Sequence, residues 1–357
     1  MNEHNNGFVV CTKCITYNHA SYIEDTLSGF VIQQTNFPVV FTIIDDASTD
    51  GEQDVLKEWA INNLETEGND ECIIRKMPYG RLIYGRYKTK INLFFAILLL
   101  SENHYRSGKS SLKINYISEW FNSSTYIAYC EGDDYWTDPQ HLNKMVIFLE
   151  EHKDYSMCFS DVKNYSQKDR KFVSSPIVGY DNSHLPVRKK ELFYYILLGK
   201  CKIQTLTVLF RASGLKNIER NDVEFMMGDT PLWLDLSQVG KIEYFPEIHG
   251  VYRITGSSAS RNPSTIRRFN LSMFEMRVYY CIKYGYEVPL VTKRKYNKYL
   301  IDCSLSSGFE MDKALYPLFP MNFFQTSIYR IAAHNNCVVK RIIQTIWKIE
   351  SRIFKRY

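Results

Sequence analysis

The stretch from Tyr126 to Pro139 has the sequence YIAYCEGDDYWTDP. Its first five residues are apolar or aromatic and favour a buried strand, and the next four place three carboxylates at the end of that strand. Such carboxylates repel one another unless a cation or hydrogen-bond donors compensate them. Mg²⁺ accepts one or two protein carboxylates and completes its coordination with water and substrate phosphate. The simpler alternative is a solvated acidic turn ahead of a helix cap at Asp138-Pro139.

Two earlier segments also have the character of buried strands that end in polar clusters. The segments are Phe8–Thr16 and Pro38–Ile44, and apolar residues at helical spacing follow each of them. Strands separated by helices predict a parallel sheet, in which ligands bind beyond the carboxyl ends of the strands. The sequence therefore predicts one site where three clusters meet: Thr16-Tyr17-Asn18, Asp45-Asp46 and Glu131-Gly132-Asp133-Asp134.

The remaining pattern completes an α/β fold, with a mostly parallel central sheet flanked by helices and a helical C-terminal region from about Ser264. We expect a third strand at Cys72–Met77 and a helix at Lys88–Leu100. A helix from Asp138-Pro139 to about Glu151 and a strand at Ser156–Val162 follow. The polar segment Ser101–Ser124 is interpreted as a surface insertion.

The positive charge of the chain lies at its end. The 357 residues include 44 Lys+Arg and 39 Asp+Glu, for a net charge of +5. Residues 340–357 carry six basic residues and one acid, so the rest of the chain is neutral and nucleic acid is not an expected partner. Nine cysteines without a repeating frame, and a start without an apolar export segment, favour a cytoplasmic protein with reduced thiols.

The same C-terminal segment is amphipathic when it is wound as a helix. All its basic residues fall on one half, and the apolar residues, which include Trp347 and Phe354, fall on the other. This pattern is typical of peripheral membrane binding. The alternative is that the apolar face packs on the protein or on a partner helix.

Four motifs in this order resemble glycosyltransferase family 2, the inverting enzymes of the GT-A fold. The resemblance is strong over about residues 8–165 and fainter through Gly228–Leu234 and Val251–Arg253. It rests on CITYNH at Cys14–His19, QTNFP at Gln34–Pro38, IDDASTDG at Ile44–Gly51 and the stretch Tyr126–Pro139.

The resemblance implies a GT-A catalytic domain at residues 1–260 and a helical region at residues 261–357. The implied reaction moves a sugar from a nucleotide diphosphate donor to a hydroxyl of a glycan or lipid-linked acceptor, in surface polysaccharide or lipopolysaccharide synthesis. A non-catalytic protein of the same fold that binds sugar nucleotides or glycans is the alternative. A lipid-linked acceptor would favour membrane binding by the amphipathic C-terminal segment, at the inner face of the cell membrane.

The resemblance also assigns roles to individual residues. Donor binding falls to Thr16, Tyr17, Asn18, Asp45, Asp46, Glu131 and Gly132. Asp133 corresponds to the family's ligand for Mg²⁺ or Mn²⁺, which neutralises charge on the leaving group. Asp229 corresponds to the catalytic base, although an Asp ahead of Pro231 also suits a helix cap. Thr255 departs from the family, because many relatives have a His there, while Arg253 either meets the diphosphate or pairs with a nearby acid.

Overall fold

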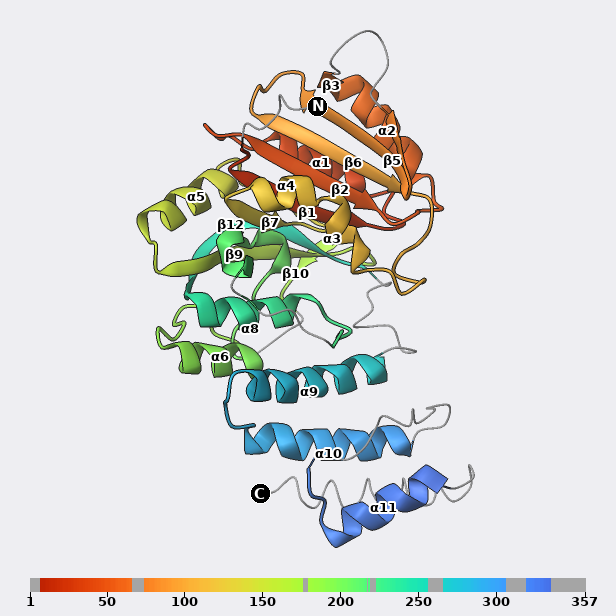
Figure 1. Ribbon diagram of the computed structural model, residues 1–357, viewed down its shortest axis with the longest axis vertical. Coiled ribbons are helices and arrows are strands. Elements are labelled where there is room, and N and C mark those ends of the chain that lie inside the picture. Colours follow the sequence, from red (N-terminus) through yellow and green to blue (C-terminus); the bar gives the residue numbers. More distant parts are fainter. Residues whose placement is uncertain are drawn as a thin grey trace. The chain divides into compact units, whose positions relative to one another are not determined.

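Four parallel strands form the centre of the sheet in the order β6–β2–β1–β7 (Figure 1). They are β1 (Val10–Thr16), β2 (Val39–Asp45), β6 (Leu93–Leu100) and β7 (Tyr126–Tyr129). Every residue of β2 is buried, as in a strand that is covered on both faces. The helices α1 (Ile23–Val31), α2 (Glu52–Asn63) and α5 (His141–Glu151) contribute side chains to the same core cluster as these strands.

Further strands, paired mostly antiparallel, extend the sheet to the order β3-β5-β6-β2-β1-β7-β11-β9-β12-β8. Strand β10 pairs with β9, β4 pairs with β5, and the long strands β9 and β12 run parallel to each other. The predicted fold class, a mostly parallel central sheet flanked by helices, is confirmed. The bounds are β3 (Leu64–Glu65), β4 (Ile74–Met77), β5 (Gly80–Tyr87), β8 (Tyr135–Trp136), β9 (Tyr155–Ser166), β10 (Lys171–Val173), β11 (Leu209–Arg211) and β12 (Lys241–Ile254).

The helix predicted at Lys88–Leu100 is wrong. Its second half, Leu93–Leu100, is the central strand β6, which pairs with β2 from Leu93 to Leu99. A continuous apolar run of this length suits a buried strand and a buried helix equally, so periodicity alone does not distinguish them. The predicted strand at the end of Cys72–Met77 is observed as β4, but at the antiparallel edge of the sheet.

The structure is a computed structural model, and it describes residues 7–65, 74–175, 179–216, 218, 223–255, 266–305 and 319–334. The chain divides into two compact units. The first comprises Met1–Arg220 and Leu232–Gly256, and the second Asn221–Pro231 and Ser257–Tyr357. The domain boundary near residue 260 remains a prediction.

The described part of the second unit is mainly helical. Its α9 (Ile266–Lys283) and α10 (Leu290–Ser304) share a small core of Leu271, Phe274, Tyr296 and Leu300, and α11 (Phe323–His334) follows them. None of the helices in the described part of the chain is both long and apolar enough to cross a membrane. The amphipathic segment predicted at residues 340–357 lies outside the described residues.

The other helices are short connections. They are α3 (Leu112–Tyr116), α4 (Ser118–Ser123), α6 (Lys189–Leu197), the 3-10 turn η1 (Thr205–Thr207), α7 (Ala212–Lys216) and α8 (Asp229–Val239). The helices α3 and α4 lie within the polar segment Ser101–Ser124, which is therefore folded as an excursion between β6 and β7. This excursion is tied to the end of β2 through the carboxylate of Asp46.

Candidate active site

The three polar clusters lie side by side, because the strands that carry them are neighbours. Thr16 and Asp45 are register partners at the ends of β1 and β2, and the Asp46 N–H donates to the Thr16 carbonyl at 2.9 Å. From the other side the Gly132 N–H donates to the Ile15 carbonyl at 3.1 Å. The convergence of Thr16, Asp45 and the acidic loop Glu131–Asp134 is therefore as the sequence predicts.

Gly132 lets the acidic loop press directly against the end of β1. A Cβ atom at this position would lie 2.2 Å from the Thr16 hydroxyl oxygen, which is far inside a normal contact. Behind this contact, Thr26 of α1 places its hydroxyl within 3.1 Å of the Gly132 carbonyl and 2.7 Å of the Asp134 carbonyl. The acidic loop is thus held both by the sheet and by α1.

A fully buried carboxylate, Glu52, joins the ends of β1 and β2. It accepts hydrogen bonds from the Thr16 hydroxyl, from the His19 N–H at 2.8 Å and from the Ser48 hydroxyl at 2.9 Å. Burial raises the pKa of Glu52, against the lowering effect of these three donors. Glu52 was not predicted from the sequence, where it stands as an ordinary acid in the first turn of a helix.

Asp45 is fully buried and keeps one acceptor oxygen for a ligand. Its Oδ1 accepts from the Ser48 N–H at 3.0 Å and from the Gln53 amide at 2.6 Å. In the described part of the chain, its buried Oδ2 has no hydrogen-bond partner. Burial raises the pKa of Asp45. A donor group of a ligand, such as a ribose hydroxyl or a base N–H, would satisfy this oxygen.

Asp46 is already occupied by the excursion between β6 and β7. Its carboxylate accepts from the Lys113 ammonium at 2.6 Å and from the His104 and Tyr105 N–H groups at 2.7 and 3.1 Å. Both charges of this ion pair are buried. Asp46 therefore anchors the excursion beside the end of β2, and its part in donor binding remains a prediction.

Tyr17 and Asn18 form the turn after β1. Asn18 has a positive φ of 57°, and its Oδ1 accepts from the Thr49 N–H at 2.8 Å, so it ties this turn to the one after β2. The Tyr17 ring faces the Arg106 guanidinium at 5.6 Å. An aromatic ring with a cation above it at the edge of the site suits contact with a flat, electron-rich base.

The carboxylates of the acidic loop have different environments. Glu131 interacts electrostatically with Lys13, whose pKa is lowered by burial and raised in part by Glu131. Asp134 is buried, and its pKa is raised well above the usual value, first by burial and then by the charges of Asp133 and Glu131. Asp133 is half-buried, and its Oδ2 lies 3.8 Å from the His19 Nε2.

Arg253 of β12 holds this loop through several hydrogen bonds. Its N–H donates to the Asp134 Oδ1 at 2.7 Å, and its Nε donates to the Asp133 carbonyl at 2.8 Å. One Nη donates to Asp25 at 2.7 Å and the other to Gln167 at 3.2 Å. Of the two roles that the sequence allows for Arg253, pairing with nearby acids is the one observed.

The donor set at Asp133 is small. Among the described residues, no three His, Cys, Asp or Glu side chains are grouped to hold a metal ion. Asp133 and His19 are nevertheless close enough to contact one ion together, and Mg²⁺ or Mn²⁺ sites in enzymes commonly use few protein ligands plus substrate phosphate. The arrangement therefore fits an ion that arrives with a diphosphate.

Asp229 begins α8 and belongs to the second unit, together with Thr230 and Pro231. Its Oδ1 accepts from the Thr230 N–H at 2.6 Å and from the Thr230 hydroxyl at 3.3 Å, so the carboxylate lies at the helix N-terminus. Its role as a base remains a prediction.

No protein-family model matches the chain. An uncharacterized protein of Mycobacterium tuberculosis is 28% identical over 240 residues, which cover 67% of this chain and 57% of that protein. The chain thus spans little more than half the length of this relative. The glucosyltransferase WfaP of Escherichia coli, which is named for transfer from UDP-Glc to α-D-GlcNAc-diphosphoundecaprenol, is 30% identical over 138 residues, or 38% of this chain and 49% of WfaP.

Among solved structures, the mannosyltransferase PcManGT from Pyrobaculum calidifontis, in complex with GDP-Man and Mn²⁺, aligns with a TM-score of 0.48 and 11% identity. The alignment covers 96% of this chain and 88% of PcManGT.

Proposed function

We propose that this protein is an inverting glycosyltransferase that moves a sugar from a nucleotide diphosphate donor to an acceptor hydroxyl. The observation that carries the proposal is the junction of β1, β2 and β7, where a buried Asp45 oxygen that has no partner among the described residues shares one edge of the sheet with the acidic loop. The first feature suits a nucleoside and the second suits a metal-bound diphosphate. The similarity over 138 residues to WfaP, which is named for transfer to a diphosphoundecaprenol-linked sugar, supports a glycosyltransferase with a lipid-linked acceptor, as surface-glycan synthesis would require.

The donor's nucleoside would lie between Tyr17 and Asp45, with Thr16 and Glu131 beside the ribose. Asp133 would hold Mg²⁺ or Mn²⁺ together with the diphosphate, and His19 would offer a second contact to the same ion. The ion would neutralise the negative charge that develops on the departing nucleotide diphosphate. Asn18, Asp46 and Gly132 would support the site indirectly, because their hydrogen bonds hold the turns that carry the donor-binding residues.

Direct displacement with inversion also requires a base that takes the proton of the acceptor hydroxyl as the new C–O bond forms. We assign this role to Asp229, whose carboxylate is half-buried at the start of α8. The donor loses its nucleotide diphosphate, and the acceptor's oxygen takes its place on the opposite face of the anomeric carbon.

A thermal-shift screen of UDP- and GDP-sugars, with and without Mn²⁺, tests donor binding, because a ligand that binds only the folded protein raises its melting temperature. We expect a shift that needs Mn²⁺ in the wild type. We also expect it to be lost in Asp133→Asn and weakened about tenfold in affinity in Asp45→Asn. Asp54→Asn, at an exposed acid of α2, is the matched control. Equal shifts in all three variants would show that the donor site is elsewhere.

Asp229→Asn separates catalysis from binding. We expect this variant to keep the nucleotide-sugar shift and to lose turnover. Turnover at the wild-type rate would remove Asp229 from the mechanism. A wild-type protein that binds a nucleotide sugar but never consumes it would instead support the non-catalytic alternative.

We also propose that the basic segment at residues 340–357 brings the enzyme to the inner face of the cell membrane, where a lipid-linked acceptor would lie. Anionic lipid contributes about 1 kcal/mol for each nearby Lys or Arg. In flotation with anionic liposomes, the full chain should float and a chain that ends at Asn336 should not. Equal partitioning of the two would contradict membrane binding through this segment.

A further inference from the structure

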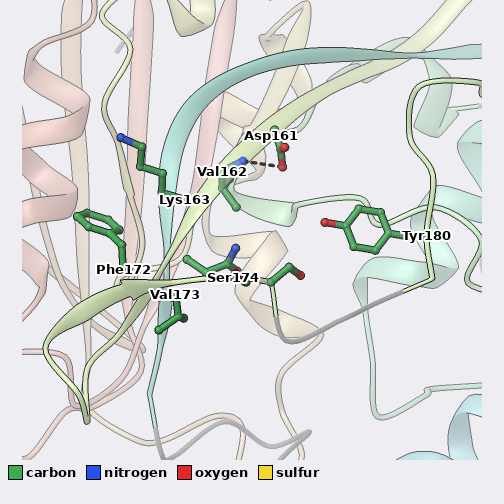
Figure 2. A pocket seen from close by; sticks show the side chains of 9 residues that line it. Asp161, Val162, Lys163, Phe172, Val173, Ser174 and Tyr180 are labelled. Carbon is green, nitrogen blue, oxygen red and sulfur yellow. Dashed lines mark hydrogen bonds between the residues drawn. The ribbon is translucent and has the colours of Figure 1, made fainter.

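A pocket of about 420 Å³ beside the hairpin of β9 and β10 draws its lining from both faces of that hairpin. Figure 2 shows Phe172 at one side of the pocket and Tyr180 at the other. Phe172 is the cross-strand partner of Tyr165, and Val173 is the partner of Asn164. Because successive residues of a strand point to opposite faces, the Phe172 ring and the Asn164 amide face different ways. These two groups therefore cannot contact the same small ligand.

The helices of the second unit differ from the rest of the chain in charge. Residues 1–256 contain 27 Lys+Arg and 33 Asp+Glu, whereas residues 257–339 contain 11 Lys+Arg and 5 Asp+Glu. The neutral balance of residues 1–339 therefore combines a net charge of −6 with a net charge of +6. The second unit resumes at Ser257, so the change of sign coincides with a structural boundary. Its helices belong to a positive region that is additional to residues 340–357.

The first half of α10 presents an exposed face that is apolar at its start and basic beyond it. Leu290 is 60% exposed and Val291 is 46% exposed. Arg294 and Lys295 are also exposed, and each stands four residues after one of these apolar side chains. Residues at this spacing share one side of a helix. The contacts of α10 with the core that it shares with α9 come from another side of the helix.

The end of α9 adds a further apolar side chain at the same end of the helix pair. Only six residues connect α9 to α10, and Figure 1 shows the two helices side by side, joined at one end. The connection is fixed by a left-handed Gly285, whose N–H donates to the Ile282 carbonyl at 3.0 Å. The Tyr286 N–H also donates to the Cys281 carbonyl at 2.7 Å. Ile282 is 71% exposed, so exposed aliphatic side chains stand at the joined end of both helices.

The cations of α10 lie where they do not stabilise the helix. Lys293, Arg294 and Lys295 stand at the end of the first turn and the start of the second, and the first turn, which is fully described, contains no acid. The N–H groups at a helix N-terminus carry partial positive charge, which disfavours nearby cations. The nearest acids in the sequence are Glu287 and Asp302. An anionic surface outside the chain would compensate these three cations.

A surface of anionic lipid fits this face better than a segment of the chain itself does. Exposed aliphatic side chains beside cations are typical of helices that lie in the membrane interface. Residues 340–357 are amphipathic, but their net charge of +5 opposes contact with a second basic surface. An anionic bilayer supplies an apolar interior for the aliphatic side chains and phosphate groups for the cations.

We propose that the first half of α10, together with the end of α9, lies on an anionic membrane surface. In this arrangement Leu290 and Val291 enter between the lipid headgroups, while Arg294 and Lys295 contact lipid phosphates. The proposal rests on the proposed location of the enzyme at the membrane and not on sugar transfer. This face is one weak signal, and stable binding takes it together with residues 340–357.

Sedimentation with sucrose-loaded vesicles tests this face in the full chain. We expect the wild type to bind vesicles of equal parts phosphatidylcholine and phosphatidylglycerol. The double substitution Arg294→Gln and Lys295→Gln should lower the partition coefficient about 25-fold, because each cation near an anionic surface contributes about fivefold. Leu290→Ser with Val291→Ser should lower it about tenfold, since two aliphatic side chains no longer enter the interface.

A matched control removes the same charge elsewhere. Lys168→Gln with Lys171→Gln changes two exposed cations at the hairpin of β9 and β10 in the first unit, and it should bind as the wild type does. The substitutions at Arg294 and Lys295 remove cations near a helix N-terminus, so the melting temperature should be no lower than that of the wild type. The Mn²⁺-dependent shift with a nucleotide sugar should also be unchanged in both α10 variants.

The vesicle measurements decide the proposal. A wild type that does not sediment with the anionic vesicles would overturn it, and so would equal partition coefficients for the wild type and both folded α10 variants. An equal loss in the control would overturn it as well, because binding would then follow the net charge alone. If a chain that ends at Asn336 partitions like the full chain while the α10 variants do not, the segment 340–357 is rejected and the α10 face is supported.

Discussion

Arg253→Met should destabilise the acidic loop, because the Arg253 side chain is 7% exposed and has several partners at once. Its loss leaves the Asp133 carbonyl without its donor, at a cost of about 1–3 kcal/mol. The ion pair to Asp25 contributes less than about 1 kcal/mol, since Asp25 is 57% exposed. The guanidinium also lies 4.7 Å from the Tyr22 ring, a contact worth about 1 kcal/mol.

The expected loss is therefore about 3 kcal/mol, since the methionine recovers part of the packing. Urea unfolding followed by tryptophan fluorescence measures the loss. Hydrogen exchange of the amides at residues 131–136 shows whether it is local, and we expect these amides to exchange faster in the variant. The matched control is Asp25→Asn, which breaks only the exposed part of the network and should cost less than about 1 kcal/mol.

Equal stabilities for the two variants would refute this reasoning, because the buried contacts of Arg253 would then contribute nothing. Unchanged exchange at residues 131–136 together with a large global loss would also refute it, since the effect would not act through the acidic loop.

Gly132→Ala should lower the free energy of unfolding by about 1–3 kcal/mol, because the added Cβ meets the end of β1 at 2.2 Å. Gly7→Ala, whose Cβ would meet its nearest neighbour at 3.8 Å, is the control for a thermal melt, and equal melting temperatures would contradict the close approach. Burial raises the folded-state pKa of Glu52 above the unfolded value of 4.5. The stability that proton binding at Glu52 gives the folded protein is therefore fully present below pH 4.5, and it is lost as the pH rises through the folded pKa. The stability of the wild type relative to Glu52→Gln should therefore fall across that window by up to about 1.4 kcal/mol per pH unit, and parallel pH profiles would exclude the effect.

The positions of Thr16, Asp45 and the acidic loop could be predicted because each follows a run of buried-strand character. Parallel strands bring their carboxyl ends together whatever lies between them in the chain. The strand β6 could not be predicted in the same way. Its eight residues are apolar throughout, and no alternation distinguishes such a run from a buried helix.

The residues that organise the site were harder to find, since their partners are remote in the sequence. Arg253 pairs with Asp25, which is 228 residues away in the sequence. Glu52 accepts a hydrogen bond from the hydroxyl of Thr16, which is 36 residues away. Neither position carries a local signal of burial. Lys113 is similar, because only the folded excursion brings its ammonium to Asp46.

The charges in the acidic loop support the proposal that a metal ion binds at Asp133 in particular. Glu131 has Lys13 as a nearby cation, and Asp134 is held by the Arg253 N–H. The Arg253 side chain donates to the backbone carbonyl of Asp133 and not to its carboxylate, among the contacts of the described residues. The Asp133 carboxylate lies near His19, which carries a charge only when it is protonated. A divalent ion would compensate this carboxylate and leave positive charge for the diphosphate, so we expect metal and donor to bind together more tightly than either alone. Calorimetry of Mn²⁺ binding with and without UDP measures this coupling, and identical affinities would contradict it.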